Sequence, residues 1–393
     1  MSLVPIGTLP HPISTLDRIG FELGWDYAHH RVCPPEAYAQ APSPLRDGLL
    51  AGQATFGLRT LNATRHVRKW LQLRLNAWLR GRSVELTQIT PNYLAQLDVS
   101  HCPVTRVPLG AGTPEGGEKP EGREKPECCA RLEGTEKPPA DAAAWGHSID
   151  RVRNSAGYAA GNLAVMSTKA NHAKAGHGFR DAIQFVKQVE AGALGGIAGL
   201  TAAQWARVAV LCSFVEPLAH DEACALPLLV LPPNRLRLFN PAQALQAFVS
   251  RQLLVPGWSQ RVSRIEALVP GKPAQRAFRD FFQALLPRVL EAGRNIAPME
   301  ARWAIEDAWR NPLVQRRWAT FARLLTAEQC EALVRRATAK KLGTGVVNPL
   351  TDAQATDGWN LETRGYVPHT PSADEPAVVR RMEAAGQQMT LAI

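Results

Sequence analysis

The chain has 393 residues, of which 45% are apolar and 20% are charged. Because this length exceeds what one hydrophobic core usually spans, we expect a multi-domain globular protein with several buried cores. The formal net charge of +10 at pH 7 favours a polyanionic partner, most simply nucleic acid.

The cysteines and the apolar runs exclude two other classes of protein. Seven cysteines stand at irregular spacings in a long chain, which is typical of a reducing cytoplasm without disulfides. No apolar run reaches the ~18 to 20 residues that a membrane span needs. The first residues also lack the basic start and continuous apolar stretch of a signal peptide. We therefore expect a cytoplasmic protein without a membrane partner.

The N-terminal region, residues 1–96, should be helical in part. Its first 50 residues are rich in proline and predict irregular structure with one or two short helices. Asp26, His29 and His30 are of metal-ligating types, but no second cluster lies nearby, so an exposed helix end is the better interpretation. Apolar residues then recur at spacings near three and four over residues 53–82, which predicts a long helix.

The other face of the predicted helix at 53–82 is basic. It carries Arg65, Arg68 and Lys69 among other cations, with few acidic neighbours. Two interpretations stay open: contact with the phosphates of a nucleic acid, or a solvated face whose long side chains cover apolar surface.

A compositional break follows at residues 110–140. The segment is rich in Glu-Lys-Pro triplets and glycine and cannot bury a core, so it predicts a low-complexity loop. Such an insertion adds little to the free energy of closing the loop.

The stretch from 145 to 176 is the part of the sequence that indicates chemistry. Residues 147–153 predict a short strand, the Asn-Ser-Ala-Gly that follows predicts a turn, and 163–166 predict a second strand. Ser167 or Thr168 should cap a short helix that ends at Gly176. This order brings Asp150 toward Asn171, so that two oxygen ligands converge.

The rest of the chain is a succession of helix signals, among them capping-box patterns that begin at Thr201, Asn240 and Thr326. We expect a helix at 179–190, a domain boundary in the Gly/Ala-rich segment 191–199, a helical domain at 200–342 and a loosely ordered tail at 343–393 with a short helix at 375–388. Phenylalanines and tryptophans at helical spacings within 274–325 should form a core. The predicted fold class is mainly α, with a small strand–strand–helix module at 97–178 inserted in a predominantly helical multi-domain chain.

Several residues of this module agree with a known pattern at once. They are Ser148-Ile149-Asp150-Arg151, Gly157-Tyr158, Gly161-Asn162-Leu163, and Asn171 with Lys174, preceded by the segment His101-Cys102-Pro103-Val104-Thr105-Arg106-Val107-Pro108-Leu109. The pattern resembles the HNH (His-Me finger, ββα-metal) endonucleases, in particular an Asp-Arg variant found among phage and bacterial members. The resemblance covers about residues 97–176. It implies a metal-dependent endonuclease that hydrolyses DNA phosphodiester bonds.

The resemblance also assigns roles to residues. It implies Mg²⁺ or Mn²⁺ held by Asp150 and Asn171, and a loop braced by Asn162. The residues placed to hold phosphates are Arg153, Lys169 and Lys174.

The general base is the departure from the pattern. Arg151 stands where the commoner pattern has histidine, and a guanidinium cannot accept a proton at ordinary pH, although it can stabilise transition-state charge. The base is then His147 or His172, or a metal-bound hydroxide formed without one.

A structural zinc site is not predicted. Many HNH domains carry two Cys-x-x-Cys pairs, whereas this chain has Cys102 with Thr105 at the first pair and Ser167 with Ala170 at the second. An apolar core should take the place of zinc, formed by Leu109, Ile149, Leu163, Val165 and Met166. The alternative function is a catalytically inactive HNH-like module that serves as a nucleic-acid-binding or protein-interaction scaffold.

Overall fold

The computed structural model describes residues 14–109, 147–192, 195–291 and 297–343, together with short strands at 348–349, 359–360 and 365–366. The predicted insertion at 110–140 and the predicted helix at 375–388 lie outside the described residues. None of the described helices combines the length and the apolar character needed to cross a bilayer.

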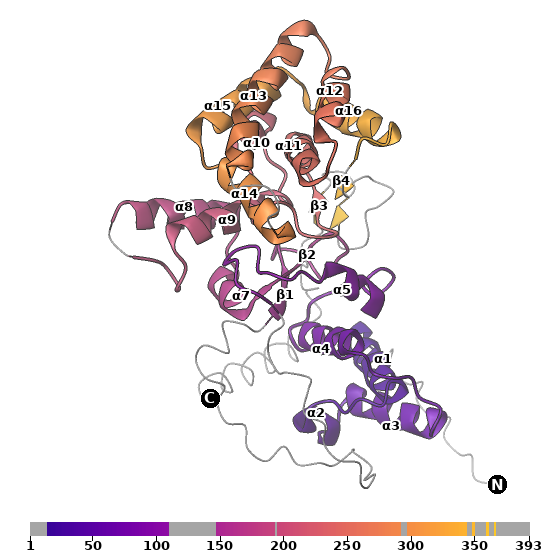
Figure 1. Cartoon of the computed structure of the whole chain (residues 1–393). Coiled ribbons are helices and arrows are strands. Elements are labelled where there is room, and N and C mark those ends of the chain that lie inside the picture. Colours follow the sequence, from indigo (N-terminus) through magenta and orange to yellow (C-terminus); the bar gives the residue numbers. More distant parts are fainter. Residues whose placement is uncertain are drawn as a thin grey trace, which may run out of the picture. The chain divides into compact units, whose positions relative to one another are not determined.

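The described chain is mainly helical, with fifteen α-helices and few strands (Figure 1). This confirms the prediction of a mainly α protein. The chain divides into two compact units, and the boundary lies between Ala95 and Gln96. The predicted module at 97–178 and the predicted helical domain at 200–342 both fall in the second unit.

The first unit is a small helical assembly. Its helices are α1 (Thr15–His29), α2 (Glu36–Gln40), α3 (Pro44–Phe56), α4 (Arg65–Leu79) and the start of α5 (Pro91–Leu97). Side-chain oxygens cap three of them, because Ser14, Ser43 and Thr64 each accept a backbone N–H from the first turn, as N-cap residues do. A core formed by α1, α3 and α4 includes Leu23, Leu45 and Leu71, all 0% exposed.

Helices α1 and α3 approach so closely that glycine is required at their crossing. A Cβ added at Gly24 would lie 1.9 Å from the carbonyl oxygen of Leu45, and one added at Gly48 would lie 1.9 Å from that of Phe21. Both distances are far below van der Waals contact. The two backbones therefore pack directly against each other.

Two sequence predictions for this unit are wrong. The described part of the first 50 residues, 14–50, is not mainly irregular, since α1 and α3 have 15 and 13 residues. The predicted helix at 53–82 is two helices: α3 ends at Gly57, which has a positive φ of 54°, and α4 begins after the cap at Thr64. The apolar spacing continued across this gap, but glycine in the left-handed region ends a helix.

The second unit contains the strands and the remaining helices. Strands β1 (His147–Arg151) and β2 (Leu163–Ser167) pair antiparallel and lead into α7 (Thr168–Lys174). The helices that follow are α8 (Phe179–Glu190), α9 (Ala202–Ser213), α10 (His220–Ala225), α11 (Pro241–Arg251), α12 (Trp258–Glu266), α13 (Lys272–Leu290), α14 (Pro298–Ala308), α15 (Pro312–Ala322) and α16 (Ala327–Ala339), with a 3-10 turn at Gln252–Leu254. Two short sheets complete it, β3 (Arg237–Leu238) with β4 (Asn348–Pro349), and β5 (Trp359–Asn360) with β6 (Gly365–Tyr366).

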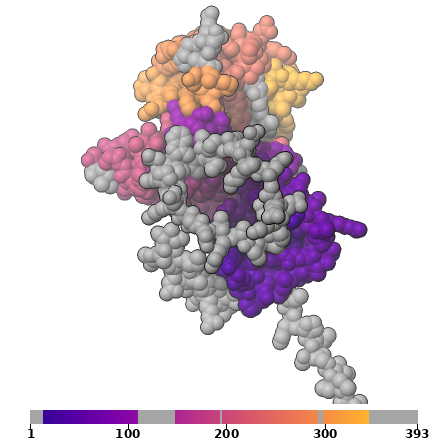
Figure 2. Space-filling view, turned by 60° about the horizontal axis from the view of Figure 1, so that its bottom comes forward, coloured from indigo at the N-terminus to yellow at the C-terminus, as the bar shows by residue number. Residues whose placement is uncertain are grey.

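The aromatic residues of α13 to α15 form the core that the sequence predicts. Trp309 lies with its ring centroid 5.3 Å from Phe281 and 5.6 Å from Trp318, and all three side chains are buried. Figure 1 shows these three helices side by side, and Figure 2 shows the surface of this part of the chain in salmon to orange at the top. Aromatic burial on this scale supplies much of the free energy that holds the unit together.

Some of the helix caps predicted for this unit are present in the structure. Thr201 and Thr326 form the predicted capping boxes at α9 and α16. Asn240 precedes α11 as predicted but does not cap it; its Nδ2 donates instead to the carbonyls of Ser213 and Glu216. Helix α7 ends at Ala175, with φ of 42°, one residue before the predicted Gly176.

Candidate functional site

The candidate site is the hairpin–helix motif formed by β1, β2 and α7. Strand β1 pairs with β2 so that His147 lies opposite Ser167 and Asp150 lies opposite Ala164. Helix α7 follows β2 without a linker, because the Oγ of Ser167 accepts the backbone N–H of Ala170 at 3.2 Å. The helix is therefore held against the hairpin that precedes it.

Asn162 organises the loop between the two strands. Its Oδ1 accepts the N–H of Arg153 at 2.9 Å, and its Nδ2 donates to the carbonyls of Arg153 and Gly157, each at 3.2 Å. The side chain is 0% exposed, so water does not compete for these hydrogen bonds. The amide connects the two ends of the loop to each other.

Two side-chain pairs connect β1 to α7. Asn171 Nδ2 donates to Ser148 Oγ at 2.7 Å, and Lys174 Nζ lies 3.0 Å from Asp150 Oδ2. Residues two apart on a strand share a face, as do residues three apart on a helix. Asp150 and Asn171 thus lie on facing sides of the same interface, but the structure pairs Asp150 with Lys174.

The pair between Asp150 and Lys174 is buried. The Asp150 side chain is 5% exposed and that of Lys174 is 0% exposed. Burial raises the pKa of the Asp150 carboxyl, and the charges of Lys174 and then Arg151 oppose that rise. Lys174 also donates to the carbonyl of Arg151 at 3.0 Å, whereas Asp150 Oδ2 has no hydrogen-bond partner of good geometry. The contact between Lys174 Nζ and Asp150 Oδ2 is therefore described as an ion pair.

Arg151 is held by the loop of the hairpin. Its Nη1 donates to the carbonyl of Ala156 at 2.6 Å and to that of Asn154 at 3.3 Å. The guanidinium carbon lies 5.2 Å from the centroid of the Tyr158 ring, within the range of a cation–π contact. These contacts fix the arginine against its own loop.

The other predicted site residues lie around the motif. His147 is half-buried at the start of β1, and His172 is exposed on α7. Lys169 is exposed on the same helix, while Arg153 donates through Nε to the Oγ of Ser155 at 3.1 Å. Lys174, which the sequence assigned to phosphate binding, is inside the protein. The remaining predicted nucleic-acid contacts, Arg65, Arg68 and Lys69, belong to α4 of the first unit.

A metal at this site would have few protein ligands. Among the described residues, no group of three or more His, Cys, Asp or Glu side chains is placed to hold a metal ion. The Asp150 carboxylate and the Asn171 carbonyl oxygen are the groups on the interface with the chemistry that Mg²⁺ prefers. They would hold the ion only if the ammonium of Lys174 moved away from the carboxylate.

The four positions that correspond to zinc ligands in the HNH pattern lie together. The N–H of Thr105 donates to Cys102 Sγ at 3.4 Å, and Thr105 Oγ1 lies 3.4 Å from Ser167 Oγ, which in turn binds Ala170. Around them Leu163, Val165 and Met166 are buried. We call these four residues the knuckle.

Helices of the same unit hold the knuckle from outside. Arg106 makes two hydrogen bonds of 2.8 Å to Asp307 and one of 3.2 Å to Glu306, and Arg207 donates to the carbonyl of Val104 at 3.1 Å. These contacts could not be predicted from the sequence, because the partners are about 100 and 200 residues apart. A contact between residues so far apart along the chain leaves no periodic pattern in the sequence.

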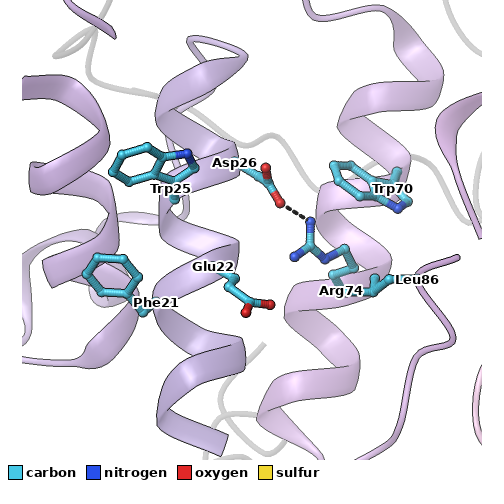
Figure 3. Close-up of a pocket in the computed structure, with 7 residues that line it drawn as sticks. All are labelled: Phe21, Glu22, Trp25, Asp26, Trp70, Arg74 and Leu86. Carbon is cyan, nitrogen blue, oxygen red and sulfur yellow. Dashed lines mark hydrogen bonds and ion pairs between the residues drawn. The ribbon is translucent and has the colours of Figure 1, made fainter. Parts of the chain in front are cut away.

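A separate pocket of about 470 Å³ lies in the first unit, lined by Phe21, Glu22, Trp25, Asp26, Trp70, Arg74 and Leu86. Figure 3 shows Asp26 and Arg74 pointing toward each other from α1 and α4. The ion pair occupies the polar side of this pocket. Asp26, considered above as a metal ligand, is thus paired with a buried arginine.

Comparison with known proteins adds no identification: no family model matches the chain, and neither a curated protein nor a solved structure matches it.

Proposed function

We propose that the hairpin–helix motif is an HNH-like module that binds nucleic acid, most simply DNA, without a catalytic metal ion. The observation that carries this proposal is the buried ion pair between Asp150 and Lys174. The ammonium supplies, next to the carboxylate, the positive charge that a metal ion would otherwise supply. Removing both groups from water is costly, and the pair offsets that cost only while it stays intact.

The assignment to an HNH-like shape is supported by three features. The order strand, strand, helix agrees with the pattern, Asn162 braces the loop, and the four knuckle positions lie in contact although three of them carry no metal ligand. A shared shape does not imply shared chemistry. The residues at the reactive positions have to be judged by their own contacts.

Those contacts favour binding over hydrolysis. Arg151 is bound to loop carbonyls and cannot accept a proton. The exposed Lys169 and the net charge of +10 support a contact with phosphates.

Metal-dependent cleavage is the second candidate, and one observation favours it. Asp150 Oδ2 has no well-aligned hydrogen-bond donor, and Asn171 extends from α7 toward the same strand. A bound Mg²⁺ or Mn²⁺ would polarise the scissile phosphate and stabilise the charge on the leaving oxygen. Asp150 and Asn171 would bind the ion, and Lys174 would shift to a phosphate.

The two candidates are separated by an assay of plasmid DNA with Mg²⁺ and with Mn²⁺. The proteins compared are the wild type, Asp150→Asn, Asn171→Ala and, as a control, Asp280→Ala, which removes an exposed carboxylate of α13. We expect DNA to be bound and left intact by all four. Cleavage by the wild type that is lost in Asp150→Asn and Asn171→Ala, but kept in Asp280→Ala, would establish the second candidate instead.

Direct titration with Mn²⁺ gives a second readout that does not need turnover. A binding module whose carboxylate is paired with Lys174 should show no saturable Mn²⁺ site. Circular dichroism spectra of the wild type and of the variants show whether a loss of DNA binding reflects a loss of fold.

A further inference from the structure

Helix α4 of the first unit has two faces of different chemistry. One face packs into the core through Val67, Leu71, Leu75 and Trp78, which are at most 7% exposed. The opposite face is exposed, and we call it the α4 polar face; its residues are Arg65, Arg68, Gln72, Asn76 and, at the C-cap, Arg80. At 100° per residue these five positions fall within an arc of about 120° on the helix.

The rotation of α4 about its axis is fixed by polar contacts on its inner side. Arg74 is ion-paired with Asp26 of α1 (Figure 3), and its guanidinium carbon lies 4.3 Å from the centroid of the Trp70 ring. The indole N–H of Trp78 donates to the carbonyl of Leu16 at 2.9 Å, and that of Trp70 donates to the carbonyl of Ile89 at 2.8 Å. The α4 polar face is therefore presented by a rigid helix.

The charged residues of α4 and of its flanking segments are all basic. Between residues 57 and 84 the sequence contains seven arginines and lysines and no aspartate or glutamate. Of these seven, Arg74 is used inside the fold. A helix that only needed a solvated surface would gain stability from acidic residues in its first turn, where α4 has none. The composition instead complements a polyanion.

The order of the polar residues along the α4 polar face suits contact with the major groove of duplex DNA. Arginines stand at both ends, and two amides, Gln72 and Asn76, stand one turn apart between them. The face is about 22 Å long, since a helix rises about 1.5 Å per residue. A major groove about 12 Å wide admits such a helix, and Gln and Asn amides can bind the adenine edge with two hydrogen bonds.

We propose that the α4 polar face binds the major groove of duplex DNA, with Arg65, Arg68 and Arg80 on phosphates and Gln72 and Asn76 at base edges. The first unit is then the part of the protein that selects a DNA sequence. This inference concerns a different unit from the hairpin–helix motif, and it holds whether or not that motif cuts DNA.

The test uses the full-length protein and a pool of duplexes of random sequence, from which bound sequences are selected and read. Binding of a selected duplex and of a scrambled one is then measured at several KCl concentrations. The variants are Arg68→Ala, the double variant Gln72→Ala/Asn76→Ala, and Arg18→Ala. Arg18 is the matched control because it is 69% exposed on α1, outside the α4 polar face.

Three results are expected. Arg68→Ala should weaken binding to both duplexes equally and lower the slope of log K against log [KCl] by about 1. The double variant should reduce the preference for the selected duplex by a factor of at least about 5 and leave the scrambled duplex almost unaffected. Arg18→Ala should match the wild type.

Any one of three results would overturn the proposal. One is that Arg68→Ala and Arg18→Ala have the same affinity and salt slope. The second is that the double variant keeps the full sequence preference, and the third is that double-stranded RNA of equal length competes better than DNA. Asp150→Asn, tested beside them, changes only the hairpin–helix motif, so a failure of the first proposed function remains distinguishable.

Discussion

The buried ion pair of Asp150 and Lys174 makes the hairpin–helix motif sensitive to substitution of either residue. Asp150→Ala leaves the ammonium of Lys174 buried without its partner, so we expect the free energy of unfolding to fall by about 3–5 kcal/mol. Urea unfolding measures this change. Asp280→Ala removes a pair whose side chains are both 50% exposed and should cost at most about 1 kcal/mol.

A double substitution tests whether the loss comes from the unpaired charge. Asp150→Leu with Lys174→Met replaces the pair by apolar groups, and it should recover most of the stability lost in Asp150→Ala. A double variant as unstable as the single one would mean that the carboxylate has a further role in the fold.

Gly161 and Gly192 differ in the space around an added Cβ, so alanine substitutions at the two positions separate steric overlap from backbone strain. Its φ is 91°, and an added Cβ would lie 1.8 Å from Cγ of Arg237. Gly192 has a φ of 84° with no atom within 4 Å of an added Cβ. Gly192→Ala should thus cost only the backbone strain, about 1–2 kcal/mol, and Gly161→Ala should cost about 1–3 kcal/mol more.

The extra cost at Gly161 has a specific rescue. Arg237→Ala removes the side chain that the new methyl group meets, so it should restore part of the stability of Gly161→Ala in denaturant titrations. If Gly161→Ala and Gly192→Ala are equally unstable, the hairpin loop does not pack against β3 as closely as described.

At the scale of secondary-structure elements, the contact of α1 with α4 should depend on pH through His30. Burial, followed by the neighbouring His29, lowers the pKa of His30 from its usual 6.5. A lowered histidine pKa favours the neutral ring in the folded state. Stability is therefore retained above about pH 6.5 and lost as the pH falls through the lowered folded-state pKa.

His30→Gln removes this titration. Between about pH 7.5 and pH 5 the melting temperature of the first unit should fall more in the wild type than in His30→Gln. His172→Gln, an exchange of an exposed residue in the other unit, should keep the wild-type dependence. An equal fall in all three proteins would assign the acid sensitivity to other groups.

The elements also show what can be predicted from sequence and what cannot. Local signals were sufficient for the capping boxes at Thr201 and Thr326, for the two strands of the hairpin and for the aromatic core, because each depends on neighbours within a few residues or on helical spacing. The split between α3 and α4 was missed, since the apolar period continues through Gly57. The pairing of Asp150 with Lys174 was also missed. Strand and helix periods place residues on a face but do not decide which of two helical residues, Asn171 or Lys174, reaches the carboxylate.

At the scale of the whole molecule, each compact unit has a hydrophobic core of its own. Units with separate cores usually unfold as separate cooperative systems. We expect two transitions in differential scanning calorimetry. Leu71→Ala, which creates a cavity in the first core, should lower one of them, with a cost of about 2–5 kcal/mol.

The second transition identifies the other unit. Leu333, 0% exposed in α16, gives the matched substitution Leu333→Ala, and it should shift only the transition that Leu71→Ala leaves in place. A single transition that both substitutions lower together would mean that the two cores melt as one.

The knuckle bears on whether the hairpin–helix motif can fold after transfer to another protein. A segment of this size seldom folds alone without a metal or disulfide. Here Arg207 of α9 binds the carbonyl of Val104, and Glu306 of α14 binds Arg106, so this region depends on residues that follow it in the chain by up to 200 positions. Grafted into another protein, the native motif should be unfolded. A graft that also carries residues 101–109, with cysteine in place of Thr105, Ser167 and Ala170 beside Cys102, should instead fold when zinc is added, because those four positions already lie in contact.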